Sequence, residues 1–187
     1  SIIFPRSHCN QCGHPLRFFE MIPILSQLFL RFKCRLCQSS IPYRYLFLEL
    51  FCGGILLLYF YDYLDFGRTY LLLFSLCVTI FDLKKSYPLL IWILGTLPLF
   101  CLGNHYLTFA LGISLAALSY IKHLNIGEGD FLYLASVSLI VPFSKILLTI
   151  ELACLFGLMY FLVRKNPNET VAFVPFLFMS VLILTFM

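Results

Sequence analysis

Two acidic residues stand at the edges of apolar segments, where a carboxylate could do chemistry. Asp82 ends one run in VTIFDLKKSYP, and Asp130 begins another in GEGDFLYLA. An ionisable group at membrane depth costs about 2.5–3.5 kcal/mol on insertion scales, so each calls for a specific reason. Two carboxylates that approach each other share a proton, because like charges cannot both ionise at short range in a low dielectric. Such a pair can act as acid and base on one water molecule, which is aspartic-protease chemistry.

Two glycines, Gly127 and Gly129, flank Glu128 immediately before Asp130. Because they lack a Cβ atom, they allow unusual backbone angles and the close approach of a second chain. We therefore expect this stretch to receive an extended peptide beside the Asp130 carboxylate. A purely structural interpretation stays open, in which Asp130 is the N-cap of a helix.

The other candidate acids also have alternative interpretations. Asp82 could form an ion pair with Lys84 or Lys85 at the membrane interface, a pairing that contributes little when it is exposed. Glu49 lies near the start of an apolar run, and we include it among the candidate substrate-binding residues.

Two CxxC pairs, separated by 21 residues, occur near the start of the chain: Cys9, Cys12, Cys34 and Cys37. Two thiolate pairs at this spacing can close a tetrahedral Zn²⁺ site with bonds of about 2.3 Å. Such a site can hold together a loop that is too small to build its own core. The alternatives are a redox role, absence of metal, or disulfide bonds, which the reducing side of a membrane disfavours.

The composition predicts an all-α, polytopic membrane protein. Of the 187 residues, 61% are hydrophobic and 12% are charged, and the mean hydropathy is +0.93. A soluble domain of this size is roughly a quarter charged and covers its surface with polar groups. The net charge of +4 is too small to indicate a nucleic acid partner.

Seven apolar runs follow a polar segment, so we expect a tetracysteine loop over residues 1–43 and a membrane domain over 44–187. Several runs are shorter than the ~20 residues of a straight span, so their ends must reach into the flanking loops. Around VPFSKI, Pro142 and Lys145 indicate either a hairpin or a kink within one helix. The candidate spans are 45–61, 68–82, 88–103, 106–121, 131–143, 146–163 and 170–187.

Basic residues test this arrangement, because they concentrate on the cytoplasmic side of membrane proteins. With residues 1–43 in the cytoplasm, eleven basic residues lie inside and only Arg68 and Lys145 lie outside. This bias favours seven spans, and hence a hairpin at Pro142, and it puts both aspartates on the cytoplasmic face. The eleven are Arg6, Arg17, Arg31, Lys33, Arg35, Arg44, Lys84, Lys85, Lys122, Arg164 and Lys165.

The combined pattern resembles the type IV prepilin peptidases, which are GxGD membrane aspartic proteases. Three pieces carry the resemblance: the loop from CNQC to CRLC with the following RYLFLEL, the tetrapeptide GEGD, and the segment VAFVPFLF. The resemblance implies cleavage of the basic leader of prepilins or pseudopilins at the cytoplasmic face of the bacterial inner membrane. It also implies methylation of the new N-terminus with S-adenosylmethionine, and a further spanning helix before the cysteine loop.

By motif, the resemblance implies roles for the residues singled out above. Prepilin or pseudopilin substrates and membrane lipid would be the partners, and zinc the structural metal. The implied catalytic residues are Asp82 and Asp130, the substrate-binding residues are Gly127, Glu128, Gly129 and Glu49, and the metal ligands are Cys9, Cys12, Cys34 and Cys37.

Two other classes of function stay open on the residues alone. One is a non-catalytic membrane scaffold that binds a partner through its zinc knuckles. The other is a small transporter in which Asp130 is an ion or proton site.

Overall fold

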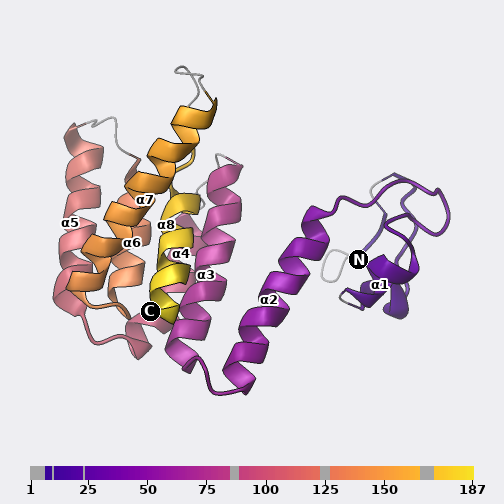
Figure 1. Ribbon diagram of the computed structural model, residues 1–187, viewed down its shortest axis with the longest axis horizontal. Coiled ribbons are helices and arrows are strands. Elements are labelled where there is room, and N and C mark those ends of the chain that lie inside the picture. Colours follow the sequence, from indigo (N-terminus) through magenta and orange to yellow (C-terminus); the bar gives the residue numbers. More distant parts are fainter. Residues whose placement is uncertain (1–6, 10, 23, 85–88, 123–126, 165–170) are drawn as a thin grey trace. The chain divides into compact units, whose positions relative to one another are not determined.

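The computed structural model describes residues 7–9, 11–22, 24–84, 89–122, 127–164 and 171–187 (Figure 1). Within these ranges the regular elements are helices, and the only β-type pairing is two isolated bridges in the N-terminal loop. The all-α prediction is therefore confirmed. The chain divides into two compact units, Ser1–Phe60 and Tyr61–Met187. Three basic residues of the predicted cytoplasmic set, Arg6, Lys85 and Lys165, lie outside the described residues.

The N-terminal unit consists of a loop with two short helical turns and one long helix. The turns are η1 (Phe18–Met21) and α1 (Leu25–Phe29), and the long helix is α2 (Arg44–Phe60). The start of α2 lies one residue before the predicted run 45–61. Helix α2 belongs to the N-terminal unit, so the boundary between the compact units follows this helix and not residue 43. The functional division at residue 43 stays a prediction.

Both CxxC pairs lie in the same kind of backbone turn. In the first turn the amide of Cys9 donates to the carbonyl of His14 at 2.9 Å. In the second the amide of Cys34 donates to the carbonyl of Ser39 at 2.9 Å, with the same offset of five residues. Each turn is therefore closed by its own backbone hydrogen bonds and holds its two cysteines on one short loop.

The C-terminal unit contains six described helices joined by short connections. Short connections place consecutive helices in opposite directions, so α3, α5 and α7 end where α4, α6 and α8 begin. The helices are α3 (Phe66–Leu83), α4 (Leu89–Leu102), α5 (Tyr106–Lys122), α6 (Glu128–Ser138), α7 (Phe143–Arg164) and α8 (Val174–Phe186) (Figure 1).

The core of this unit is built from α3, α6 and α8. Tyr133 and Val137 of α6, Val174 and Leu177 of α8, and Leu71 of α3 are almost fully buried. Helix α8 packs on α3 and on α7, while α6 packs on α5 and contacts α3. These contacts fix the ends of α3 and α6 relative to each other.

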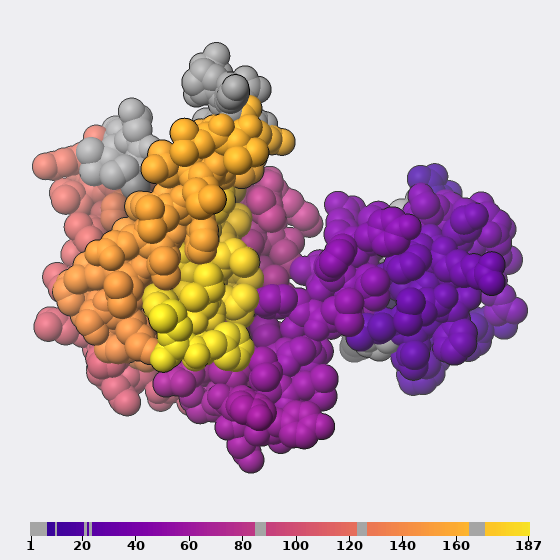
Figure 2. Space-filling view, viewed as in Figure 1, coloured from indigo at the N-terminus to yellow at the C-terminus, as the bar shows by residue number. Residues whose placement is uncertain are grey.

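The outer helices of the unit expose large apolar side chains, among them Leu94 of α4, Leu107 of α5 and Leu158 of α7. Figure 2 shows α7 beside α8 on the viewed face of the unit. By length and composition, α3 and α7 could each cross a membrane, and α4, α5 and α8 are shorter apolar helices within the described ranges. An apolar exterior of this kind fits a lipid environment.

The hairpin predicted at Pro142 is confirmed. Helix α6 ends at Ser138 and α7 begins at Phe143, so they are separate helices. The residue before a proline is disfavoured in the helical conformation, which accounts for the break. The predicted span 131–143 was wrong at its C-terminal end, because α6 ends at Ser138, five residues before the end of the apolar run.

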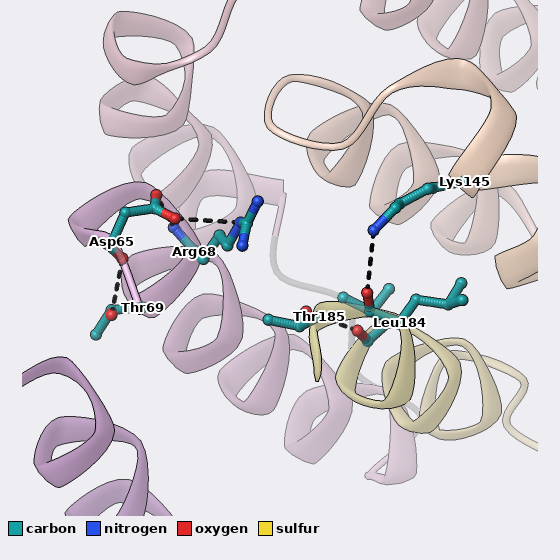
Figure 3. Close-up of polar contacts among 7 residues, drawn as sticks. Asp65, Arg68, Thr69, Lys145, Leu184 and Thr185 are labelled. Atoms are coloured by element: carbon teal, nitrogen blue, oxygen red, sulfur yellow. Dashed lines mark hydrogen bonds and ion pairs between the residues drawn. The ribbon is translucent and has the colours of Figure 1, made fainter. Parts of the chain in front are cut away.

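Polar contacts organise the end of the unit where α3 and α7 begin and α8 ends. Asp65 is the N-cap of α3, and its Oδ2 accepts a hydrogen bond from the Arg68 amide at 3.1 Å. The Arg68 Nε atom also lies 3.1 Å from Asp65 Oδ1 (Figure 3). Lys145 Nζ donates to the carbonyl of Leu184 at 3.5 Å and joins α7 to α8 (Figure 3).

Helices α5 and α6 approach closely because small residues face each other. A Cβ atom on Gly112 would lie 2.7 Å from the Cβ and 2.9 Å from the Cα of Ala135. Real Cβ atoms do not approach so closely, so any side chain at position 112 forces the two backbones apart. Small residues serve the same purpose at helix interfaces in membranes generally.

We predict that Gly112→Ala lowers the free energy of unfolding by about 1–3 kcal/mol, because the added methyl group overpacks the interface with Ala135. Thermal unfolding in detergent, followed by the fluorescence of the single tryptophan, Trp92, would measure the change. Trp92 Nε1 donates to Ser136 Oγ of α6 at 2.9 Å, so its signal reports on this packing. The control is Gly53→Ala, where a Cβ has nothing within 4 Å. Equal melting temperatures for the two variants would contradict the close contact.

Candidate functional site

The structure places the two candidate aspartates at one end of the C-terminal unit. Asp82 lies in the last turn of α3 and Asp130 in the first turn of α6, and both side chains are half-buried. The two helices contact each other, and Asp130 lies close enough to Asp82 for their charges to interact. Residues that are 48 positions apart in the chain are thus neighbours in the fold.

A backbone hydrogen bond holds the Asp82 carboxylate. Its Oδ2 accepts the Val174 amide at 3.2 Å, and Val174 is the first residue of α8. The first amides of a helix have no partner within the helix, and the N-cap of α8, Phe173, supplies no side-chain bond. Asp82 therefore caps α8 from a different helix, where the helix dipole also favours a negative charge.

The expected alternative for Asp82, pairing with a nearby lysine, is not what the described residues show. The ion pair found among the described residues joins Arg68 and Asp65 at the opposite end of α3, and Lys84 makes none with Asp82. Lys85 lies outside the described residues.

Asp130 is not the N-cap of its helix, because Gly127 occupies that position. The Asp130 amide donates to the carbonyl of Gly127 at 3.1 Å. A Cβ atom on Gly127 would lie 3.0 Å from Asp130 Oδ2, so glycine leaves room for the carboxylate. The predicted unusual backbone angles were wrong: the φ of Gly127 is −60°, Gly129 lies inside α6, and the one described glycine with positive φ is Gly13. Glu128 is exposed beside them.

Two buried hydroxyl groups lie deeper between α3 and α6. Tyr133 follows Asp130 by about one helical turn, and Ser75 precedes Asp82 by about two. Both residues are 0% exposed, and the Tyr133 hydroxyl lies near the Ser75 side chain. Neither oxygen has a hydrogen bond of good geometry within the described residues. We did not predict this pair of residues. The signal in the sequence was a serine and a tyrosine, each within an apolar run and close to one of the two aspartates.

Glu49 belongs to the N-terminal unit, whereas both aspartates belong to the other. Its Oε2 accepts hydrogen bonds from the Ile24 amide at 2.8 Å and from Gln27 Nε2 at 2.9 Å. Glu49 thus ties the loop around α1 to helix α2. A role for Glu49 in substrate binding stays a prediction.

The four predicted metal ligands converge in the N-terminal unit. The Sγ atoms of Cys9, Cys12, Cys34 and Cys37 all lie within 4.8 Å of one another, and all four cysteines are free thiols. The sulfurs are 3.8 Å apart for Cys9 and Cys37 and 4.0 Å apart for Cys12 and Cys34. A tetrahedral zinc site with Zn–S bonds of ~2.3 Å requires about 3.8 Å between sulfurs. The cluster could therefore hold a metal ion.

The surroundings of two cysteines favour the thiolate form that a metal requires. The backbone amides of Cys12 and Gln11 lower the pKa of the Cys9 thiol to about 6. The hydroxyl and the amide of Ser39 lower the pKa of the Cys37 thiol below its usual value. These donors are fixed by the two turns, so the fold favours the thiolate form of Cys9 and Cys37.

Comparison with known proteins agrees with the motifs. Residues 1–63 match the family described as "Bacterial Peptidase A24 N-terminal domain". The predicted resemblance to type IV prepilin peptidases is confirmed. Over 70 residues the chain is 49% identical to the prepilin leader peptidase/N-methyltransferase of Myxococcus xanthus, and over 65 residues it is 38% identical to the protein of that name from Dichelobacter nodosus.

These matches cover a limited part of each protein. The match to the Myxococcus xanthus protein spans 37% of this chain and 20% of the relative, and the second spans 35% and 23%. The chain thus matches about a fifth of the length of these prepilin peptidase relatives. No solved structure matches the chain.

We predict that Cys34→Ser abolishes metal binding by the N-terminal unit and unfolds its loop. Cys34 is buried, serine offers no thiolate, and structural zinc contributes about 10–16 kcal/mol to the folding of small domains. Elemental analysis of the purified protein would give the zinc content, and limited proteolysis would report the loop. The control is Cys154→Ser on the exposed surface of α7, which should retain the metal. Equal zinc content in both variants would exclude the cluster as the site.

Proposed function

We propose that this chain acts as a membrane aspartic endopeptidase that removes the basic leader of type IV prepilins or pseudopilins. Asp82 and Asp130 are the proposed catalytic carboxylates. The observation that supports the proposal is that Asp82 in the last turn of α3 and Asp130 in the first turn of α6 lie at the same end of the helical unit, where their charges interact. The similarity to prepilin leader peptidases supports the class of substrate.

In the proposed reaction the two carboxylates share one proton. The ionised carboxylate removes a proton from a water molecule as the water oxygen bonds to the scissile carbonyl carbon. The protonated carboxyl group then gives its proton to the amide nitrogen as the carbon–nitrogen bond breaks. One water is consumed, and a new carboxyl group and a new amine are formed. The Val174 amide would keep Asp82 oriented through both steps.

The surface beside the aspartates suits a basic, extended leader. Gly127 and Gly129 present a backbone without side chains, and the exposed carboxylate of Glu128 would attract lysine or arginine. The apolar exterior of the helices would place the unit in the bacterial cytoplasmic membrane. The distribution of basic residues would put the catalytic end on the cytoplasmic side.

Two further groups belong to the proposal. Zinc would be held by Cys9, Cys12, Cys34 and Cys37, where it would cross-link the two turns of the loop. S-adenosylmethionine would supply a methyl group to the new N-terminal amine, in keeping with the name of the relatives.

We predict that Asp82→Asn and Asp130→Asn each lower leader removal by at least about a hundredfold, because asparagine cannot carry the proton. Asparagine keeps a carbonyl oxygen for the Val174 amide, so both variants should fold. Incubation with a prepilin and S-adenosylmethionine, followed by intact mass measurement, would separate cleavage from methylation. The control is Glu151→Gln, an exposed acid of α7.

Normal processing by either aspartate variant would reject the dyad. If function then depended on Cys34, the scaffold would be the better interpretation. Uptake of an ion or a proton into proteoliposomes that is lost with Asp130→Asn would favour the transporter instead.

We also predict that Gly127→Ala lowers kcat/KM about tenfold or more, with a fall in kcat, because the new methyl group would displace the Asp130 carboxylate. Steady-state kinetics on a purified prepilin would measure both constants. Gly53→Ala, where a Cβ meets nothing, is the matched control. An unchanged kcat would show that the close contact between Gly127 and the Asp130 carboxylate is not needed for cleavage.

A further inference from the structure

The segment between the two cysteine turns buries its polar side chains and exposes its apolar ones. In α1 the polar residues Ser26 and Gln27 are buried, whereas Leu25, Leu28 and Phe29 are exposed. Water ordinarily selects the opposite arrangement, because the burial of apolar surface is the main favourable contribution to folding. The outer side of α1 therefore indicates an apolar neighbour in place of water.

The turn η1 shows the same inversion. Phe18 is 83% exposed, whereas Glu20 is 8% exposed. Because η1 packs against α1, the exposed side chains of both turns belong to one small region, which we call the apolar face: Phe18, Phe19, Leu25, Leu28 and Phe29. Glu20, Ser26 and Gln27 contribute instead to the wall of a cavity of about 520 Å³ inside the unit, together with both cysteine turns and the start of α2.

The exposed charges around the apolar face have one sign. Four exposed basic residues flank it in the sequence: Arg17, Arg31, Lys33 and Arg35. The guanidinium of Arg35 lies 5.8 Å from the centroid of the Phe19 ring, so this charge adjoins the apolar face itself. Residues 1–48 contain a single acid, Glu20, and it is buried. The described surface of the cysteine loop thus combines large apolar side chains with positive charge.

We propose that the apolar face docks the cysteine loop onto an anionic lipid surface, with the apolar side chains among the acyl chains and the basic residues at the phosphate groups. Protein surfaces that lie in the plane of a membrane combine Phe and Leu with Lys and Arg in this way. Basic side chains near anionic lipid are attracted to it over about one Debye length. The same charges would repel a basic leader peptide, so lipid is the better partner.

The chain itself holds this loop next to a bilayer. Helix α2 follows the loop directly and contains most of the predicted span 45–61. A second contact made by a tethered segment is intramolecular, so a weak contact is sufficient to keep the segment bound. The inference rests on the membrane location in the proposed function, and it is independent of the two catalytic carboxylates.

Photolabelling from lipid would test the docking. The full-length, zinc-loaded protein is reconstituted into vesicles of phosphatidylglycerol or of phosphatidylcholine, each with a trace of phosphatidylcholine that carries a diazirine in its acyl chain. Trypsin cleaves after Arg17 and Arg31 and releases residues 18–31, which contain the whole apolar face. It also releases residues 146–164 of α7, a helix long enough to cross a membrane, as the internal reference.

The label on residues 18–31, relative to that on α7, should be at least about threefold higher in phosphatidylglycerol than in phosphatidylcholine, because four basic residues adjoin the apolar face. Equal labelling in the two lipids, or an unlabelled 18–31 beside a labelled α7, overturns the inference.

A double variant, Phe18→Glu with Phe29→Glu, should lower this label about tenfold, because two carboxylates would have to enter the acyl chains. Both phenylalanines are more than 80% exposed, so the fold of the unit should persist, and zinc content would show it. The matched control, Phe18→Leu with Phe29→Leu, stays apolar and should keep the label. Equal labelling of the two double variants overturns the inference. If the glutamate variant loses zinc, the comparison of lipids with the unmodified protein decides.

Addition of a prepilin to the same vesicles tests the other occupant of the apolar face. A label on residues 18–31 that falls as prepilin is added would assign the face to the substrate protein and overturn its assignment to lipid. Cleavage is measured in parallel. Normal cleavage with residues 18–31 unlabelled removes this inference and leaves the proposed peptidase intact, whereas labelling without cleavage supports the docking and rejects the peptidase.

Discussion

The hydrogen bond from the Val174 amide to the Asp82 carboxylate joins the end of one apolar helix to the start of another. A helix that begins among apolar side chains carries amides that water cannot reach, and each must find an acceptor. Helix α8 finds its acceptor on α3, so the two helices are fixed in register. The same group that completes the secondary structure of α8 is thereby presented at the proposed catalytic end. One carboxylate would then serve both the fold and the proposed chemistry.

Helix α6 brings the second carboxylate to this place because it is short and rich in small residues. Ala135 allows α5 to approach at Gly112, and Ser136 accepts the indole hydrogen of Trp92 from α4. These contacts hold the second half of α6 against α4 and α5. Gly127 then leaves space for the Asp130 side chain. The placement of Asp130 thus depends on two glycines, Gly112 and Gly127, which leave space for neighbouring groups, as well as on the side chains that pack around α6.

Patterns that are local in the chain were the ones that could be predicted. Apolar runs and prolines were sufficient for the helices and for the break at Pro142, and spacing was sufficient for the four cysteines. The hydrogen bond from the Val174 amide to Asp82 could not be predicted. The two residues are 92 positions apart, and every residue except proline has a backbone amide, so the residue type gives no indication of this donor. The space that Gly127 leaves for the Asp130 carboxylate could not be predicted for a related reason, since it is visible only once the neighbouring side chain is placed.

The turns at Cys9 and Cys34 are each complete in their own backbone bonds, and the segment between them carries Glu20 and Gln27. A metal ion that joins the two turns would restrict that segment and hold together the wall of the cavity that both turns, the segment and the start of α2 line. Such an arrangement couples two equilibria: a molecule bound in the cavity would raise the affinity for the metal by the same factor by which the metal raises the affinity for that molecule. Removal of zinc would therefore weaken the binding of that molecule by this factor.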